Sequence, residues 1–143
     1  MEEIVQEVEL DYKPRDVFLD FHDRTQRWAV IIAHRRAGKT VSCLNDVIYR
    51  ALTENKEDGR YAYVAPYYAQ AKTIAWDYLL KFSQPVLAKA NQSELWVELV
   101  NGARIRLFGA DTGENLRGLY LDSVVLDEYA DMKPSIWGSV VRP

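Results

Sequence analysis

The chain has 143 residues, 48% of them apolar and 27% charged, with a formal net charge of −3. This length gives one domain at most, and the apolar content with four tryptophans predicts a folded protein. No apolar run approaches the roughly eighteen residues of a membrane span, and the acidic start, Met1 to Glu3, is unlike a signal peptide, so a cytosolic protein is expected. The net charge does not indicate nucleic-acid binding unless the basic residues gather on one face or on a missing part.

The N-terminal third of the chain contains a lead-in, a predicted strand and a loop. Residues 1–25 include Pro14 and scattered aromatic residues, and we expect an irregular or partly helical segment. The apolar run from Trp28 to Ala33 is predicted to be a strand. Residues 33–40, Ala-His-Arg-Arg-Ala-Gly-Lys-Thr, follow the phosphate-loop pattern G-x-x-x-x-G-K-(S/T), with alanine in place of the first glycine. That replacement requires Ala33 to keep a negative φ.

A small-residue turn between a strand and a helix directs several backbone N–H groups to one point, where a phosphate can bind. Lys39 is expected to reach the β- and γ-phosphates of ATP, and Thr40 to place its hydroxyl on Mg²⁺. Arg35 and Arg36 are either solvated, or one of them acts in cis as an arginine finger on the γ-phosphate. The expected nucleotide-binding residues are Ala33, His34, Arg35, Arg36, Ala37, Gly38, Lys39 and Thr40.

Two further elements are predicted from hydrophobic periodicity. Apolar residues at helical spacing predict a helix over residues 39–53, which contains the single cysteine, Cys43, as a small buried residue. A second strand–helix unit is predicted, with a strand at 61–65 and a helix over 68–82. The apolar residues expected on one face of that helix are Ala71, Ile74, Tyr78 and Phe82.

A hairpin is predicted after residue 85. The alternating segments 94–99 and 104–108 flank Asn101-Gly102, which is typical of a two-residue type I′ turn. Arg104 and Arg106 alternate on one strand face, where they either contact phosphates or are simply solvated.

A strand ending at two adjacent carboxylates completes the pattern. Residues 123–126, Ser-Val-Val-Leu, are mostly apolar and lead into Asp127 and Glu128. We expect this strand to lie beside the loop strand, with Asp127 in the metal shell and Glu128 facing the water that attacks the γ-phosphate, and Asp131 is an alternative for either role. Strand–helix alternation predicts an α/β fold of the P-loop NTPase kind, with a parallel sheet, flanking helices and an inserted hairpin. Because only fifteen residues follow Glu128, the fold is expected to be incomplete at the C-terminus.

Four segments together resemble the N-terminal ATPase domain of large terminase subunits, the DNA-packaging motors of tailed bacteriophages. The doubled arginine in the loop is the most specific part of this resemblance. The segments are Tyr12-Lys13-Pro14-Arg15 with Phe21-His22; Gln26-Arg27-Trp28 running into the loop; Tyr63-Val64-Ala65-Pro66 with Ala69-Gln70-Ala71-Lys72; and Asn115-Leu116-Arg117-Gly118 before Val125-Leu126-Asp127-Glu128.

The resemblance implies an enzyme that hydrolyses Mg-ATP to move double-stranded viral DNA into a procapsid, in the cytoplasm of an infected or lysogenic bacterium. The implied partners are the portal protein, the small terminase subunit and further copies in a ring. The chain is then the N-terminal part of one ATPase domain, with a lead-in at 1–25 and a truncated core at 26–143, and the family's nuclease domain has no counterpart in it. Arg117 is a second finger candidate, acting on a neighbouring subunit or capping a loop.

Three points stay open at the level of sequence. Related sequences have a glutamine shortly after the Pro-Arg pair that reads adenine, and this chain has none at that place. Tyr12, Arg15 or Phe18 would then stack on or flank the base. The alternative is that the two aromatic residues pack on the sheet. The alternative among enzymes is a helicase-like or repair P-loop ATPase. Such a protein would share the acid-pair strand but would have a loop richer in glycine. A non-catalytic prophage remnant is the alternative outside enzymes.

Overall fold

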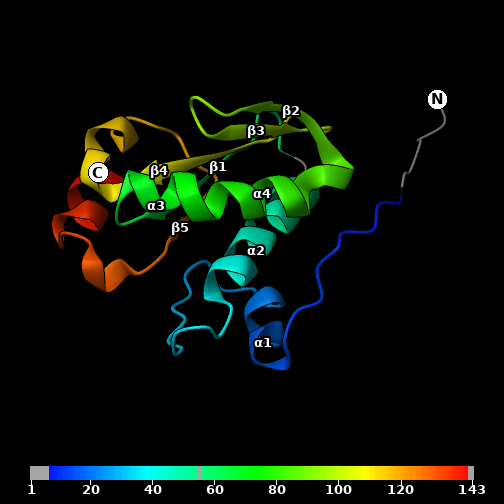
Figure 1. Ribbon diagram of the computed structural model, residues 1–143, viewed down its shortest axis with the longest axis horizontal. Helices are drawn as coiled ribbons and strands as arrows, with labels where there is room; N and C mark the ends of the chain where they lie inside the picture. The colour runs from blue at the N-terminus through cyan, green and yellow to red at the C-terminus, as the bar shows by residue number, and fades with distance from the viewer. Residues whose placement is uncertain (1–6, 55, 142–143) are drawn as a thin grey trace.

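A computed structural model describes residues 7–54 and 56–141, so residues 1–6 of the predicted lead-in lie outside the described residues. Five strands form one sheet in the order β2-β3-β4-β1-β5 (Figure 1). β1 pairs in parallel with both β4 and β5, whereas β3 is antiparallel to β2 and β4. The strands are β1 (Arg60–Ala65), β2 (Leu87–Asn91), β3 (Trp96–Leu99), β4 (Arg104–Gly109) and β5 (Ser123–Leu126). The predicted α/β fold with a parallel core and a hairpin is confirmed.

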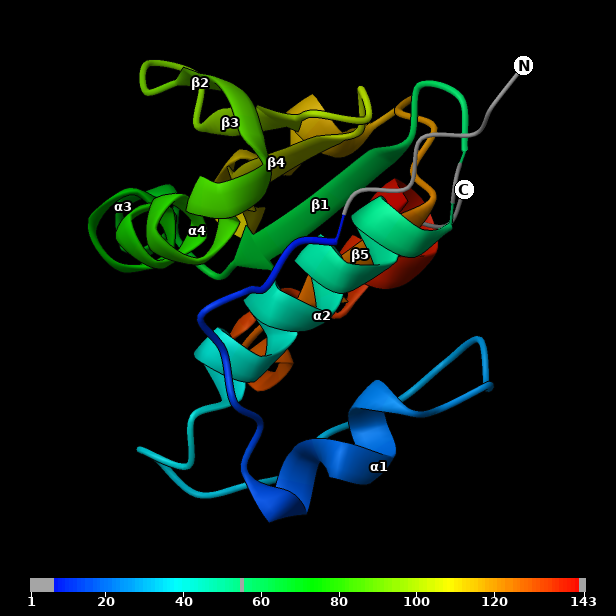
Figure 2. The ribbon, with the colours of Figure 1, turned by 90° about the vertical axis from the view of Figure 1, so that its right-hand side faces the viewer.

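The helices cover the sheet unequally. The longest, α2, packs on the same face of the sheet as the α3–α4 segment, and Figure 2 shows it running alongside β1. The α-helices are α1 (Leu19–His22), α2 (Lys39–Thr53), α3 (Tyr68–Gln70) and α4 (Trp76–Ser83). Shorter helical turns are η1 (Asp16–Phe18), η2 (Ala71–Ala75), η3 (Gln84–Val86), η4 (Ala110–Leu116), η5 (Tyr129–Asp131) and η6 (Ile136–Val141). No helix in the described part of the chain has both the length and the apolar character to cross a bilayer.

Two cores follow from the alternation of side chains along the strands. Tyr61 and Tyr63 of β1 face the core under α2 and α4, whereas Ala62 and Val64 face a second core that includes residues of η4 and η6. Central strand residues are therefore buried on both faces, which is typical of parallel strands. The second core consists of Ala62, Val64, Phe108, Leu116, Met132 and Ile136.

The helix predicted over residues 68–82 is present but contains a π-helical turn at Ala71–Ala75. This wider turn lengthens the spacing of the buried positions, because each π turn takes more residues than an α turn. Ala75 and Leu79 are consequently buried, while Ile74 and Tyr78, predicted on the buried face, are 52% and 37% exposed. The helix is confirmed and its predicted face is wrong at these two positions.

The strand predicted from Trp28 to Ala33 is wrong. The segment is irregular, and Val30 and Ile32 are 88% and 95% exposed. A strand requires a neighbour for its backbone N–H and C=O groups, and none of the described strands pairs with this run. The expectation that the acid-pair strand lies beside it is wrong for the same reason, since β5 pairs with β1.

The predicted hairpin forms between β3 and β4, but its turn is not type I′. That turn needs positive φ at both central residues, and of Asn101 and Gly102 only Gly102 has it, at 87°. The Gly102 N–H instead donates to the Leu99 carbonyl at 2.9 Å, and the Leu99 N–H donates to Ala103 at 2.8 Å. This is a longer loop with a glycine bulge. The Asn101 side chain accepts a hydrogen bond from the Ala103 N–H within the turn (3.2 Å) and donates from Nδ2 to the Ala51 carbonyl near the end of α2 (2.8 Å), a tertiary bond that the local pattern does not contain.

Candidate nucleotide-binding site

The loop at residues 33–38 leads directly into α2, which begins at Lys39 as predicted. Gly38 has a φ of 95° and Arg36 a φ of 65°, so the chain turns sharply twice before the helix. Ala33 is not among the residues with positive φ, which meets the condition for losing the first glycine of the pattern. The sequence therefore forms a compact turn at a helix N-terminus, where backbone N–H groups lack helical partners.

Two basic side chains hold the loop. Lys39 Nζ donates to the carbonyl of Ala33 at 2.5 Å, so its ammonium group lies across the mouth of the turn. Arg15 of the lead-in donates to the carbonyls of Ala37 (3.0 Å) and Arg36 (3.4 Å). The loop is thus fixed by its own Lys39 and by Arg15, which comes from the lead-in segment.

The side chains within the loop differ in exposure. Ala37 is buried, at 5% exposure, whereas His34, Arg35 and Arg36 are exposed. Both guanidinium groups are therefore at the surface beside the turn. Arg117, the other finger candidate, is exposed directly after Leu116, which is buried in the second core.

The loop and the acid pair meet through one short contact. Thr40 Oγ1 donates to Asp127 Oδ2 at 2.7 Å, which joins residues 87 positions apart. Asp127 continues the line of β5, since its N–H donates to the Val64 carbonyl of β1 at 2.9 Å. The structure thus brings together Lys39, Thr40 and Asp127, the three residues on which the sequence interpretation chiefly depends.

The Asp127 carboxylate accepts two further hydrogen bonds. The Tyr63 hydroxyl donates to Oδ2, and the Glu128 N–H donates to Oδ1 at 3.0 Å. Burial raises the pKa of the Tyr63 phenol, so this group is a neutral donor. Sequence reasoning missed Tyr63 in this role because a tyrosine in an apolar strand is ordinarily a packing residue; the only signal is that it lies in the Tyr63-Val64-Ala65-Pro66 segment.

The donor set fits magnesium. A hydroxyl and a carboxylate oxygen, adjacent to a phosphate loop, are the hard oxygen ligands that Mg²⁺ takes alongside substrate phosphates. Cys43, one helical turn beyond Thr40, does not compete for a softer metal. It is 8% exposed, and burial raises the pKa of its thiol to about 12, so the thiol is protonated at neutral pH. The prediction of a small buried residue is confirmed.

Glu128 lies in a different environment from Asp127. Its side chain is exposed, and its backbone is left-handed, with a φ of 51°, at the start of η5. Positive φ is uncommon for a residue with a side chain and is found where structure or function requires it. Asp131, the alternative to either carboxylate, is exposed at the end of η5. One carboxylate of the pair is therefore buried and hydrogen-bonded, and the other is accessible.

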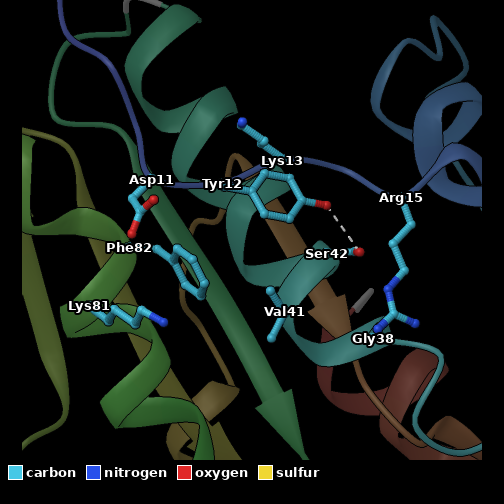
Figure 3. A pocket seen from close by; sticks show the side chains of 9 residues that line it. All are labelled: Asp11, Tyr12, Lys13, Arg15, Gly38, Val41, Ser42, Lys81 and Phe82. Atoms are coloured by element: carbon cyan, nitrogen blue, oxygen red, sulfur yellow. Dashed lines mark hydrogen bonds between the residues drawn. The ribbon is translucent and has the colours of Figure 1, made fainter.

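A cavity of about 370 Å³ lies beside the N-terminus of α2, between the lead-in and α4 (Figure 3). Tyr12 and Arg15, two of the residues expected to flank the base, line this cavity. Phe18 is instead 2% exposed, with its ring 3.9 Å from where a Cβ on Gly38 would lie, so it is a packing residue. The complete lining is Asp11, Tyr12, Lys13, Arg15, Gly38, Val41, Ser42, Lys81 and Phe82.

A buried polar cluster fixes the lead-in to α2. Asp46, at 2% exposure, accepts hydrogen bonds from Arg50 Nε (2.9 Å) and Arg24 (3.1 Å) and pairs with His22 Nδ1 (3.1 Å). The other ring nitrogen of His22 shares a hydrogen bond with the Tyr12 hydroxyl at 2.7 Å. Sequence reasoning missed Asp46, whose signal is a carboxylate on the apolar face of an amphipathic helix.

These features are those of a P-loop NTPase-like α/β domain. No protein-family model matches the chain. The chain is 27% identical over 154 aligned residues to the protein named "Terminase, large subunit" of Thermus phage G20c, and equally to that of Thermus virus P23-45. The match covers 94% of this chain but 31% of each relative, so the chain spans less than a third of their length.

The fold also matches solved structures. The large terminase ATPase domain of Thermus phage P74-26 superposes with a TM-score of 0.77 at 26% identity, over 94% of this chain and 61% of that domain. A mutant of the same domain gives the same TM-score at 24% identity. The expected resemblance to the ATPase domain of phage large terminase subunits is therefore confirmed, and it favours that interpretation over a helicase-like one.

Proposed function

We propose that this protein hydrolyses ATP with Mg²⁺ and that hydrolysis drives double-stranded viral DNA into a procapsid. The observation that supports this most directly is the bond between Thr40 and Asp127, because it joins a phosphate loop closed by Lys39 to the carboxylate of the acid pair. Two unrelated stretches of sequence thereby form one oxygen-rich site next to a cationic turn. The similarity to proteins named as terminases supports the use of this chemistry in packaging.

The proposed mechanism assigns a role to each residue of the site. The backbone N–H groups of residues 34–40 bind the phosphates, and Lys39 exchanges the Ala33 carbonyl for the β- and γ-oxygens. Thr40 and Asp127 would hold Mg²⁺, which would neutralise charge on the phosphates. Glu128 orients the attacking water and accepts its proton, which requires the accessible position that it has.

An arginine is proposed to complete the site. Arg35 or Arg36 would neutralise the transferring oxygens from within the same subunit, and Arg117 would do so from a neighbouring subunit in a ring. Such a group is worth roughly 10³ to 10⁵ in rate. The base is proposed to enter the cavity lined by Tyr12 and Arg15.

The proposal for DNA rests on the sheet face opposite the α2 core. Lys89, Glu98, Arg104 and Arg60 lie in successive register across four strands, and Arg106 follows two residues after Arg104 on the same face. Four cations and one carboxylate therefore gather on one face of a protein whose net charge is negative. We propose that this face contacts DNA phosphates, since phosphate contacts need positive charge and no base-reading geometry.

The remaining proposals follow the resemblance. Residues 1–25 are a lead-in and residues 26–143 the N-terminal part of one ATPase domain, which works as a homo-oligomeric ring with the portal protein and the small terminase subunit. The proposed location is the cytoplasm of an infected or lysogenic bacterium.

The direct test is Lys39→Ala, compared with Lys72→Ala as a control at an exposed lysine of η2. Steady-state phosphate release should be abolished by the first change, because the loop loses its point charge, and retained with the second. Hydrolysis by Lys39→Ala at the unmutated rate would refute the loop assignment.

A further inference from the structure

The Tyr63 hydroxyl contacts Asp127, yet the ATP hydrolysis proposed above assigns no role to Tyr63. Tyr63 is 3% exposed and lies on β1 opposite Val125 of β5. Asp127 is two residues beyond Val125, so it lies on the same face of the sheet one step further along. The Tyr63 side chain therefore reaches diagonally across the strand pair to the carboxylate, where its hydroxyl donates to Oδ2.

The hydrogen bonds restrict how the Asp127 carboxylate can lie. Oδ2 accepts from both Thr40 and Tyr63, and Oδ1 accepts from the backbone N–H of Glu128. With donors on both oxygens, rotation about the side-chain torsion breaks at least one bond. Magnesium demands near-ideal octahedral geometry, so a carboxylate fixed relative to the Thr40 hydroxyl has a direct use at this place.

We propose that Tyr63 is a positioning residue for magnesium: its hydroxyl fixes the Asp127 carboxylate so that Thr40 and Asp127 present their oxygens to one ion. In this proposal Tyr63 acts through the Asp127 carboxylate and is not itself a ligand of nucleotide or metal. This inference rests on the proposed ATP and magnesium site.

The same strand supplies a matched control. Tyr61 lies two residues earlier on the same face of β1, is 2% exposed, and donates its hydroxyl to a different carboxylate, Glu54, at 2.9 Å. Tyr61→Phe and Tyr63→Phe thus remove the same group from equally buried rings, and both keep the ring that packs. Only the second change alters the surroundings of Asp127.

The experiment measures binding rather than turnover. A fluorescent ATP analogue is titrated into the unmutated protein and both variants, in EDTA and over a series of Mg²⁺ concentrations, with folding checked by circular dichroism. Tyr63→Phe should leave affinity in EDTA unchanged and raise the Mg²⁺ concentration for half-maximal binding about tenfold, as is typical when a group supporting a metal ligand is removed. Tyr61→Phe should shift neither quantity.

A double-mutant cycle with Asp127→Asn tests the route of the effect. If Tyr63 acts through Asp127, adding Tyr63→Phe to Asp127→Asn should shift the Mg²⁺ midpoint no further. Equal midpoints for the two tyrosine variants, or additive shifts in the cycle, would overturn the proposal and leave Tyr63 as a packing residue. Should Tyr63→Phe fail to fold while Tyr61→Phe folds, a positioning role is likewise overturned in favour of a structural one. Unmutated protein whose nucleotide binding is insensitive to Mg²⁺ would instead refute the proposed function itself.

Discussion

The Asp46 cluster offers the sharpest test of how the lead-in is held against the nucleotide site. Asp46→Ala removes the carboxylate that, among the described residues, Arg24, Arg50 and His22 share; their side chains are 15 to 22% exposed. These groups are too buried to regain full hydration, so the change leaves positive charge and hydrogen-bond donors without their partner.

The size of the effect can be bracketed. Exposed ion pairs contribute roughly 0.2 to 1 kcal/mol, and breaking a fully buried pair costs about 3 to 5 kcal/mol. With a buried carboxylate and mostly buried partners, we expect the free energy of unfolding to fall by about 3 kcal/mol. At roughly 2 to 4 °C for each kcal/mol in a domain near this size, Tm should drop by about 6 to 12 °C.

The assay is thermal unfolding followed by circular dichroism, with Glu98→Gln as the control. Glu98 pairs with Arg104 at 3.1 Å, but both side chains are about one-third exposed, so its loss should lower Tm by no more than a few degrees. A similar small shift for Asp46→Ala would refute the reasoning and show that the cluster is held by packing alone.

Three further outcomes are expected. Glu128→Gln should keep Mg-ATP bound while stopping hydrolysis, whereas Asp127→Asn should weaken metal-dependent binding; equal loss of affinity in both would show that the two carboxylates do not have separate roles. Inactive Arg117→Ala subunits mixed with inactive Lys39→Ala subunits should regain some ATPase activity in oligomers shown by sizing to be mixed, because an intact loop then faces an intact arginine. If no activity returned, Arg117 would not act on a neighbouring subunit. Arg106→Ala should weaken DNA binding similarly for all sequences and reduce its dependence on log salt concentration by about one unit, and an unchanged slope would exclude a phosphate contact.

Local signals predicted most of the fold. The helix over 39–53 was predicted with its observed bounds, because periodicity and the preceding glycine act within the segment itself. The run at 28–33 shows the limit of such reasoning, since an apolar run becomes a strand only when another strand accepts its hydrogen bonds. β2 was not predicted, because its sequence, Leu-Ala-Lys-Ala-Asn, has little β propensity and it is held by pairing with β3.

In the candidate site, too, some residues could be predicted from the sequence and others could not. Lys39, Thr40 and Asp127 were predicted because each occupies a fixed place in a short motif. The supporting contacts of Tyr63, Arg15 and Asp46 join segments far apart in the chain, so the sequence signals at these positions do not identify their partners. Whether Arg35, Arg36 or Arg117 acts as the finger depends on distances to phosphate oxygens, and therefore remains a prediction.

The exposed run at residues 28–33 affects how the protein behaves in solution. Val30 and Ile32 are almost fully accessible, and burying side chains of this kind is worth about 1.5 to 3 kcal/mol each. Any extended backbone that aligns with this run would gain that burial together with new backbone hydrogen bonds, which is how exposed apolar segments promote self-association. Self-association of the polypeptide should therefore increase with protein concentration, and a charged residue in place of Ile32 should reduce it.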